Sequence, residues 1–571
     1  MRSLDTDVLI LGSGGAGLFA ALHAHQAQPS FSITVAVKGL LGKCGCTRMV
    51  QGGYNVALAP GDSVERHFMD TIEGGKWLPD QELAWKLVTL AVERIHELEN
   101  ELGCFFDRNP DGTVHQKAFA GQTFDRTVHK GDLTGIEIIN RLAEQVWARR
   151  IARLEEHRAV ALLKNRAGDA LAGVLMIDMR TGEYLLARAK AVLLGTGGGP
   201  TMYRYHTPSG DKSCDGLAMA LHAGLALRDM EMVQFHPTGL LAGPHTRMTG
   251  TVLEEGLRGS GGYLLNAARE RFMPAYDAQA ERATRDVVSR AMFSEMRAGR
   301  VTPDGGLYIS MAHLGAENVA RQFKGMVERC ADCGFDLAGG LVEVVPTAHY
   351  MMGGVEFAPD CRTALPGLFV AGEDAGGVHG ANRLGGNGVA NSTVYGGVAG
   401  DAIAAWVATE GAWRDPDPAA LETAVRRCEP RTGGARGSLE PLREQLYDTM
   451  WHKVGIIRDA GGLTAALSDL AALEAELDRY SLPDGARAFN LAWHDWLNLK
   501  NLTEVSRVIS YAALAREDSR GAHFRADHPA TGALEQSSYT SVRLSGGQPD
   551  LAMKPVAFTR VRPGESLLSS P

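Results

Sequence analysis

One stretch of this chain indicates its architecture most clearly: DTDVLILGSGGAGLFAALHAHQA, residues 5–27. An apolar run typical of a buried strand leads into a glycine turn and then into a helix rich in Ala and Leu. Gly12, Gly14 and Gly17 have the G-x-G-x-x-G spacing, which permits a tight turn and lets backbone N–H groups approach a pyrophosphate at the helix N-terminus. The stretch therefore predicts a βα unit that binds a dinucleotide. A glycine-rich turn without a ligand is the competing interpretation.

The second strand is predicted at ITVAVKG, residues 33–39, and Lys38 stands at its end. An NAD-binding domain usually has an acid there, which holds a ribose hydroxyl, so the lysine weakens the case for NAD and leaves FAD open. Two later strands, within residues 189–200 and 366–377, each run into a glycine loop. Because open α/β sheets bind ligands at the carboxyl ends of their strands, we expect both loops to face the cofactor.

The balance of charges limits the class of partner. The chain has 58 Lys and Arg against 67 Asp and Glu, a net charge of -9, which argues against non-specific binding to nucleic acid. It has no run of about 18 apolar residues that would span a membrane. Its first strand pattern begins by Asp7, so we expect no leader peptide. We expect any association with a membrane to come through a partner.

The eight cysteines are sparse in a chain of 571 residues, which is typical of a reducing compartment. Cys330 and Cys333, in CADC, have the spacing of a metal or redox pair, but the sequence has no second pair. We therefore interpret them as structural thiols and expect no metal site. No four cysteines have the spacing of an iron–sulfur cluster, so a second chain would have to carry such clusters.

Hydrophobic periodicity outlines the rest of the chain. Residues 80–102 predict an amphipathic helix with Asp80 as its N-cap. The segment from about 236 to 350 is dense in Arg, Glu and Gly, and we expect it to form an inserted domain that caps the substrate. From about residue 405 the pattern turns helical, and after Arg525 we expect an irregular tail.

Three basic side chains in the middle of the chain indicate an anion site. His236 in QFHPTG, His349 in TAHYMMGG and Arg383 in HGANRLGGN each lie in a predicted glycine-flanked loop, where a cation faces a ligand rather than the core. The charged segments EEGLRG, residues 254–259, and TRDVVSR, residues 284–290, add the groups of a proton relay. For each residue taken alone, a hydrogen-bonded structural role is the alternative.

A series of motifs runs through residues 5–528 in this order: GSGGAG, MVQGG, QKAFAGQ, VQFHPTGL, EGLRGSGGYLLN, RDVVSRA, AHYMMGGV, GLFVAGE, HGANRLGGN and EDSRGAH. In this order and context they resemble the flavoprotein subunit of succinate dehydrogenase and fumarate reductase, a family that includes L-aspartate oxidase. The resemblance implies an α/β fold. Its expected parts are an FAD-binding Rossmann-like domain (1–235 and 350–404), an inserted α+β capping domain (236–349), a C-terminal helical domain (405–528) and an irregular tail (529–571).

The resemblance also implies where the cofactor binds. FAD would lie in the first domain, with its isoalloxazine facing a dicarboxylate held under the capping domain. Gly12, Gly14 and Gly17 would hold the pyrophosphate, and Glu373 the ribityl chain. The other residues expected at the cofactor are Gly15, Ala16, Lys38, Cys46, Thr47, Gly52, Gly53, Thr196, Gly197, Gly198, Asp215 and Asn387.

The same resemblance assigns the catalytic residues. Reduction of an alkene conjugated to a carboxylate delivers a hydride to one carbon and a proton to its neighbour. Arg285 matches the family's proton donor or acceptor, and Glu255 and Arg258 match its relay to solvent. Cationic His349 and Arg383 would stabilise the charge that hydride addition pushes into the carboxylate. The residues expected at the substrate are His236, Glu254, His349, Arg383, Phe119 and Gln51.

The loop GKCGCTRMVQGG, residues 42–53, departs from the membrane-bound respiratory members of the family. In those proteins a histidine just before the threonine is attached covalently to FAD, whereas Cys46 stands at that place here, followed by Thr47. We therefore expect noncovalent FAD, as in L-aspartate oxidase, and a cysteinyl-flavin thioether is the alternative. Covalent attachment is associated in this family with a raised flavin potential that favours succinate oxidation. Its loss therefore favours alkene reduction, or transfer of electrons to a quinone, O₂ or another soluble acceptor.

Glu254 is the second departure, since relatives typically have a threonine there that binds a substrate carboxylate. Two carboxylates within about 4 Å repel by on the order of several kcal/mol in a partly buried site, unless one is protonated or bridged by a cation. One hypothesis is that this half of the pocket accepts an amine, amide or hydroxyl group. The other is that Glu254 swings outward and pairs with a basic residue.

We therefore expect an FAD-dependent oxidoreductase that interconverts C–C single and double bonds next to a carboxylate, with proton transfer through Arg285. Its partners would be a small carboxylate and an iron–sulfur electron-transfer subunit, with no nucleic acid. Its expected place is the cytoplasm, or the inner face of a membrane through that subunit. The alternatives are an amino-acid oxidase similar to L-aspartate oxidase, an enzyme for a non-standard dicarboxylate analogue, and a noncatalytic flavoprotein.

Overall fold

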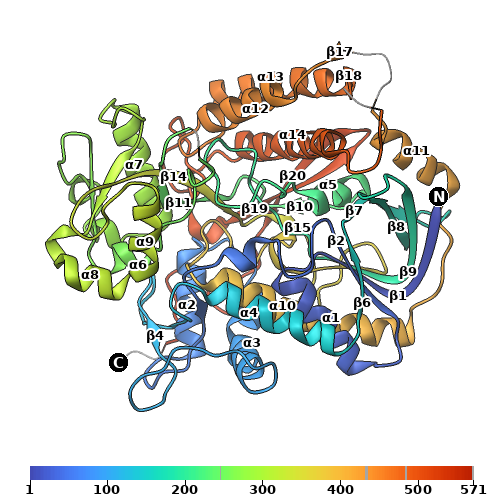
Figure 1. Ribbon diagram of the computed structural model, residues 1–571, viewed down its shortest axis with the longest axis horizontal. Helices are drawn as coiled ribbons and strands as arrows, with labels where there is room; N and C mark the ends of the chain where they lie inside the picture. The colour runs from blue at the N-terminus through green and yellow to red at the C-terminus, as the bar shows by residue number, and fades with distance from the viewer. Residues whose placement is uncertain (245, 431–434, 483–484, 569–571) are drawn as a thin grey trace.

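The computed structural model describes residues 1–244, 246–430, 435–482 and 485–568 (Figure 1). A seven-stranded sheet has the order β6-β2-β1-β9-β8-β7, with β16 beside β9. Its strands are β1 (Arg2–Leu11), β2 (Ile33–Val37), β6 (Ala152–Glu155), β7 (His157–Lys164), β8 (Leu171–Asp178), β9 (Tyr184–Leu194) and β16 (Leu368–Val370). Strands β6, β2, β1, β9 and β16 run parallel, whereas β7 and β8 are antiparallel to their neighbours.

Helices cover this sheet and build most of the remaining body. They are α1 (Gly15–Ala27), α2 (Val64–Gly74), α3 (Gln81–Asn100), α4 (Thr134–Ala148), α5 (Asp215–His222), α6 (Gly256–Gly259), α7 (Arg285–Arg297), α8 (Ala316–Gln322), α9 (Lys324–Asp332), α10 (Asn387–Thr409), α11 (Pro418–Cys428), α12 (Glu440–Lys453), α13 (Ala460–Arg479) and α14 (Leu491–Ala515). None of the helices in the described part of the chain is long and apolar enough to cross a membrane.

The parallel strands bring their carboxyl ends to one edge of the sheet. The last residue of β1, Leu11, pairs with Ala36 of β2 and with Leu194 of β9, and Val370 of β16 also pairs with Leu194. The loops that follow these four strands therefore meet at one place, as the sequence predicted for a ligand site.

The predicted βα unit is confirmed, because β1 and α1 flank the glycine turn. Gly12 has φ +106°, and a Cβ there would lie 2.1 Å from the carbonyl oxygen of Gly195. Helix α1 is buried all along its first turns and packs on α10, where a Cβ at Gly400 would lie 2.5 Å from the oxygen of Ala20. These glycines therefore serve the turn and the close packing of two helices.

The expected amphipathic helix over residues 80–102 is also confirmed as α3. The Asp80 carboxylate accepts hydrogen bonds from the backbone N–H groups of Glu82 and Leu83 at 3.0 and 3.2 Å, so it caps the helix as predicted. Its apolar face includes Leu83, Leu87 and Leu98, which are buried.

Residues 233–351 form a second body at one end of the molecule (Figure 1). Its antiparallel sheet has the order β11-β14-β13-β12, and α6 to α9 pack around it. The strands are β11 (Val233–Leu240), β12 (Tyr263–Leu265), β13 (Leu307–Ser310) and β14 (Val342–Met351). A separate apolar core, which includes Leu264, Met292 and Leu307, fills this body. We refer to it below as the capping body.

The C-terminal helices α12, α13 and α14 lie side by side (Figure 1). After them the structure differs from the predicted irregular tail. Where an irregular tail was expected, β19 (Ser538–Ser545) and β20 (Gln548–Pro555) form an antiparallel hairpin. Gly546 and Gly547, both at positive φ, supply its two-residue turn, a strong hairpin signal that the sequence analysis missed. The hairpin joins β10 (Leu227–Arg228) and β15 (Gly354–Val355) in a four-stranded sheet.

Short pairings complete the described strands. A small antiparallel sheet consists of β3 (Tyr54–Asn55), β5 (Thr127–Val128) and β4 (Gln116–Lys117), and β17 (Ala435–Arg436) pairs with β18 (Tyr480–Ser481). The first of these matters for the site, because it carries Lys117 and leads into the loop with Phe119.

Candidate functional site

A cavity of about 620 Å³ lies where the carboxyl edge of the seven-stranded sheet meets the capping body. One end is lined by the first turn of α1 and by the loops after β2 and β9. The other end is lined by side chains of β11, β14 and α7. The cavity therefore joins the predicted cofactor residues to the predicted substrate residues in a single space.

The dinucleotide end is shaped by the start of α1. Gly14 precedes the helix without a capping side chain, and both Gly14 and Gly15 line the cavity. The Gly15 N–H donates to Thr47 Oγ1 at 3.1 Å. This hydrogen bond holds the segment after β2 that contains Thr47 against the start of α1. Uncapped amides at a helix N-terminus favour a pyrophosphate, so this end fits the predicted FAD.

Lys38, at the end of β2, lies next to an acidic residue from another element. Its ammonium donates to Asp215 Oδ2 at 2.8 Å, and Arg158 donates to Oδ1 of the same carboxylate at 2.7 Å. Burial alone would raise the pKa of Asp215, but the two cations outweigh it and hold the pKa far below its usual range. The anion beside the end of β2 is therefore supplied by α5.

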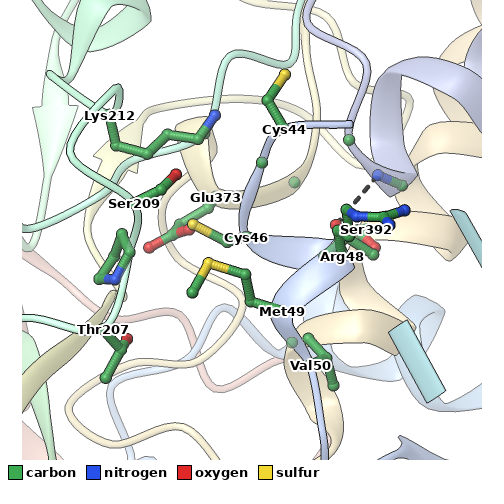
Figure 2. A pocket seen from close by; sticks show the side chains of 18 of the residues that line it. Cys44, Cys46, Arg48, Met49, Val50, Thr207, Ser209, Lys212, Glu373 and Ser392 are labelled. Atoms are coloured by element: carbon green, nitrogen blue, oxygen red, sulfur yellow. Dashed lines mark hydrogen bonds between the residues drawn. The ribbon is translucent and has the colours of Figure 1, made fainter. Parts of the chain in front are cut away.

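Cys46 begins the short 3₁₀-helix η1 (Cys46–Met49) and lies in the cavity wall (Figure 2). Its side chain lies near Glu373 and points away from Cys44, so the two thiols do not form a pair (Figure 2). Burial raises the pKa of Cys46 to about 12, so the sulfur is a neutral thiol. In the described part of the chain no three His, Cys, Asp or Glu side chains are placed to hold a metal ion.

The polar loop between β9 and α5 adds cavity residues that the sequence analysis did not single out. Thr207, Ser209 and Lys212 line the cavity (Figure 2), and so does Asp211. Lys212 Nζ donates to the Thr196 carbonyl oxygen at 3.1 Å. The segment HTPSGDKS follows a predicted cofactor loop and is rich in small polar residues. That composition is the signal that would have identified it.

His236 and His349 lie on strands, not in the loops that we expected. They come from the paired strands β11 and β14, and their ring centroids are 5.4 Å apart. Burial and the charges of Arg285 and Arg383 lower both pKa values far below the usual range. The uncharged imidazole is therefore favoured in both rings, whereas the sequence analysis expected a cationic His349.

Hydrogen bonds orient the two rings. The backbone N–H of Thr238 donates to His236 Nδ1 at 3.3 Å, so the proton of this neutral ring is on Nε2. His349 Nδ1 lies 2.8 Å from Thr207 Oγ1. A neutral imidazole with its proton on Nε2, as in His236, offers a hydrogen bond to an anion without adding a charge.

Arg383 supplies the positive charge beside these rings. It is 5% exposed, and its guanidinium lies 4.4 Å from the centroid of the Tyr350 ring. Burial, together with the charge of Arg285, lowers its pKa to about 10, so it remains a cation. Within the described residues its Nε and the Gln51 Oε1 are buried without a hydrogen-bond partner, which points to a polar ligand in the cavity.

Arg285, Glu255 and Arg258 form a buried chain of charges. Arg285 Nε and Nη2 donate to Glu255 Oε2 at 3.1 and 2.5 Å, and Arg258 Nη2 donates to Oε1 at 3.2 Å. Burial alone would raise the pKa of Glu255, but the two guanidinium groups outweigh it and lower the pKa. Arg258 lies behind the cavity wall and donates to the Glu281 oxygen at 2.8 Å.

Glu254 combines parts of both sequence hypotheses. It lines the cavity and is only 5% exposed, so it does not swing out to solvent. It nevertheless pairs with a basic residue, Lys117, through Oε1. Burial raises its pKa despite this partner.

The structure does not bring every predicted cofactor residue to the cavity. Gly17 packs against Gly12, where a Cβ would lie 2.0 Å from the carbonyl oxygen, and Gly198 packs against Glu373 and Met351. Asn387 is buried and holds Asn55 and His67 at 2.8 and 3.0 Å. The other predicted cofactor residues line the cavity, as do all the predicted substrate residues and two of the catalytic three, Arg285 and Glu255.

The CADC segment lies away from this cavity. Cys330 is buried in the core of the capping body, and burial raises its pKa to about 12. Cys333 is half-buried beside the same core, and neither forms a disulfide.

Comparison with known proteins adds an independent finding. The FAD binding domain family matches residues 7–389, and the fumarate reductase flavoprotein C-terminal family matches residues 443–567. The chain is 40% identical to a subunit of fumarate reductase (CoM/CoB) from Methanothermobacter marburgensis, over 92% of this chain and 95% of the relative. It is 34% identical to the 8-methylmenaquinol:fumarate reductase flavoprotein subunit of Wolinella succinogenes, over 97% and 91%.

Solved structures agree with these sequence relatives. The FrdA chain of Escherichia coli quinol fumarate reductase superposes with a TM-score of 0.92 at 32% identity, covering 99% of each chain. Mycobacterium smegmatis Sdh1 superposes with a TM-score of 0.87 at 35% identity, covering 99% of this chain and 96% of that one.

Proposed function

The chain belongs to the flavoprotein family of succinate dehydrogenase and fumarate reductase and is a flavin-dependent oxidoreductase acting on CH–CH groups, and on this premise we propose that Arg285 transfers the proton in that reaction. The substrate is a small unsaturated acid or its saturated product. Its carboxylate binds Arg383 and His349, and the reacting carbons lie beside Arg285.

The placement of Arg285 carries this proposal. Arg285 is 6% exposed and lines the cavity. Glu255 holds two of its nitrogens, and Gln234 Oε1 accepts from the third, Nη1, at 3.0 Å. All three guanidinium nitrogens of Arg285 are therefore held by hydrogen bonds at the wall of the cavity. A group held in one orientation in this way is suited to proton transfer at one position of a bound ligand.

Proton transfer from an arginine requires a strong acceptor. A guanidinium is a poor acid in water, but the carbanion-like carbon that forms next to a carboxylate during hydride addition is basic enough to take its proton. Glu255, a carboxylate between two guanidinium groups, then takes a proton from Arg258 on its far side and passes one to Arg285, which restores the guanidinium. Glu281 and the partly exposed Arg271 continue this line of groups towards the surface.

Bound FAD would deliver or accept the hydride at its N5 atom. The chain's own part is to hold the pyrophosphate at the first turn of α1 and the ribityl region beside Glu373. Gln51 Oε1, which has no hydrogen-bond partner among the described residues, and Gly52, which lines the cavity against Phe119, fit the same ligand.

We propose that FAD is bound without a covalent bond. The Cys46 sulfur is a neutral thiol, and only the thiolate is a good nucleophile. Acid precipitation of the purified protein should leave all yellow colour in the supernatant, and a yellow pellet would contradict the proposal. A Cys46→Ser variant should release the same amount of flavin.

The electron partner is proposed as an iron–sulfur subunit, and through it the chain would lie at the inner face of a membrane. No described cluster of cysteines is available to carry electrons beyond the flavin. The relatives that support this proposal bear the names of subunits.

An anaerobic reoxidation experiment tests the proposed function. The bound FAD is reduced, and unsaturated acids or imino acids are added while the return of oxidised flavin absorbance is followed. We expect fumarate-type acids to reoxidise it, and Arg285→Lys to slow the reaction by about 10²–10⁴-fold with FAD still bound.

The matched control is Arg282→Lys, since Arg282 is exposed on the neighbouring segment. This variant should react at the wild-type rate. Reoxidation by imino acids alone would favour the amino-acid oxidase instead, and an undiminished rate in Arg285→Lys would remove Arg285 from the mechanism.

A further inference from the structure

Lys212 places its ammonium group where three loops of the cofactor end meet. Its Nζ lies 3.9 Å from the point that a Cβ of Gly45 would occupy, after β2, and 3.9 Å from the same point at Gly197, after β9. The Gly45 point is also 3.9 Å from the Cα of Gly14, at the start of α1. Figure 2 shows the side chain extending towards the loop that carries Cys46. The ammonium therefore lies beside the helix N-terminus that suits a pyrophosphate.

Hydrogen bonds and packing hold Lys212 in this position. Its backbone N–H donates to the Ser209 oxygen at 3.0 Å, and its carbonyl oxygen accepts from Thr201 Oγ1 at 2.6 Å. A Cβ at Gly199 would lie 2.5 Å from the Lys212 Cβ, so the start of the side chain packs directly on the Gly199 backbone. Among the described residues the ammonium makes one hydrogen bond, to the Thr196 oxygen at 3.1 Å. Because an ammonium has three protons to donate, two are left for a ligand.

The charge of Lys212 is available to a ligand. Burial alone would lower its pKa, but the acidic groups around it, among them Asp211, outweigh burial and raise the pKa, so the side chain is a cation. Within the described ranges Lys212 forms no ion pair, whereas Lys38 and Arg158, at the same end of the cavity, both pair with Asp215. An unpaired cation in the wall of a ligand cavity favours an anionic part of the ligand.

Lys212 lies near residues expected at both halves of FAD. Asp215, in the first turn of α5, holds Lys38 at the end of β2, which is where a dinucleotide fold binds a ribose. Glu373, expected at the ribityl chain, is close enough to Lys212 to act on its charge. In FAD the pyrophosphate joins the ribose of adenosine to the ribityl chain and carries the negative charge. The position of Lys212 therefore matches the pyrophosphate.

We propose that Lys212 binds the pyrophosphate of FAD and supplies a charge that retains the cofactor without a covalent bond. This inference rests on the proposed noncovalent attachment, since a covalently bound flavin cannot leave the protein. It assigns Lys212 a role in holding the cofactor and none in the transfer of hydride or proton.

The test measures the dissociation constant of FAD from the holoenzyme, through the rise in flavin fluorescence on dilution. We expect Lys212→Met to raise this constant at least about tenfold, because a charge-assisted hydrogen bond to phosphate is lost. Lys212→Gln keeps a donor for the Thr196 oxygen but has no charge, so it should weaken binding at least about tenfold as well. Lys324→Met, on α9, is the control, because it removes the same charge from a side chain that is 79% exposed.

Two probes identify the part of FAD that Lys212 contacts. ADP contains the pyrophosphate without the flavin, adenosine has neither, and each competes with FAD when the diluted protein binds it again. We expect Lys212→Met to weaken competition by ADP by the same factor as binding of FAD, and to leave competition by adenosine unchanged. The reduction potential of the flavin, measured against a redox dye at saturating FAD, should stay the same, because the pyrophosphate is remote from the flavin ring.

The outcomes separate this inference from the proposed function. If Lys212→Met weakens FAD but not ADP, or shifts the equilibrium with the dye at least about tenfold, Lys212 acts on the flavin or ribityl part and the inference is overturned. Unchanged dissociation constants in both Lys212 variants would overturn it as well. The proposed oxidoreductase function fails on a different result, the absence of any unsaturated acid that reoxidises the wild-type flavin. A yellow pellet after acid precipitation would overturn the noncovalent attachment and this inference with it.

Discussion

Neutral histidines at the substrate end show how burial acts on single residues. His236 and His349 lie beside Arg285 and Arg383 in the wall of the cavity, and burial together with these charges favours the uncharged ring in both. The sequence predicted that these residues and Arg383 share a site, because the motifs around them are specific. It did not predict their charge, since that depends on neighbours from β11, β14 and α7 that only the folded chain brings together.

Glu373 gives a prediction at the same scale. Burial raises its pKa to about 7 from an ordinary value of 4.5. The folded protein therefore holds this proton more tightly than the unfolded chain, and the stability of the FAD-free protein should fall as the pH rises from about 4.5 to 7 and then level off. Glu373→Gln keeps an acceptor for the Met351 N–H, at 3.0 Å in the wild type, and removes the titration.

The expected result is a variant that equals the wild type near pH 4.5 and exceeds it at pH 8 by about 1–3 kcal/mol in free energy of unfolding. Denaturant unfolding of both FAD-free proteins across this range measures it. Glu317→Gln, exposed on α8, serves as the control. Parallel pH profiles for Glu373→Gln and wild type would mean that Glu373 is ionised at no cost.

Helices and strands differ in how much of the information that determines them lies within their own segment of sequence. Helix α3 was predicted with its cap because Asp80 and the apolar spacing lie within one segment, and β1 and α1 were predicted because the glycine turn lies between them. The β19–β20 hairpin also has a local signal, the Gly546–Gly547 pair. The sequence analysis missed it because it judged this segment by its overall composition. Strand pairing in the capping body has no such signal, since β11 and β14 are far apart in sequence.

The turn between β1 and α1 gives a prediction at the scale of elements. A Cβ at Gly12 would lie 2.1 Å from the Gly195 oxygen, so Gly12→Ala must push the loops after β1 and β9 apart. Gly112 has a similar positive φ of +85° and no atom within 4 Å of a Cβ, so Gly112→Ala adds backbone strain without a clash. The pair separates the two effects.

We expect Gly12→Ala to lower the flavin content of the purified protein at least about tenfold, because the pyrophosphate site depends on this close approach. Gly112→Ala should keep full flavin content and lose only about 1 kcal/mol of stability. Absorbance of the protein and of its released flavin provides the measurement. Full flavin content in Gly12→Ala would contradict this prediction, because it would show that the turn can accommodate a Cβ and still bind FAD.

At the scale of the whole molecule, buried charges join parts of the chain that are remote in sequence. Lys117 and Glu254 are 137 residues apart and close the cavity between two bodies. Arg516 and Glu231 are 285 residues apart and join the end of α14 to the link before β11. The sequence offered a basic partner for Glu254 as one hypothesis but did not identify Lys117, and it did not predict the pairing of Arg516 with Glu231. A charge pattern along the chain does not say which partner folding will bring near.

Arg516 gives the prediction at this scale. Its guanidinium is 2% exposed and donates to Glu231 at 2.6 Å and to the Ser538 oxygen at 3.0 Å, so it ties α14, the link before β11 and the β19–β20 hairpin together. Arg516→Met would leave Glu231, which is fully buried, without its cation. Removing one partner of a buried pair typically costs about 3–5 kcal/mol.

We therefore expect Arg516→Met to lower the free energy of unfolding by about that amount, with the helices and the β19–β20 hairpin unfolding in one transition. Arg543→Met is the matched control, because Arg543 pairs with Asp550 within the same hairpin but is 65% exposed, and such surface pairs contribute about 0–1 kcal/mol. Denaturation followed by circular dichroism and by flavin fluorescence measures both variants. If the two lose equal stability, the buried network does not hold the parts together, and the cavity must owe its shape to the sheet and the capping body alone.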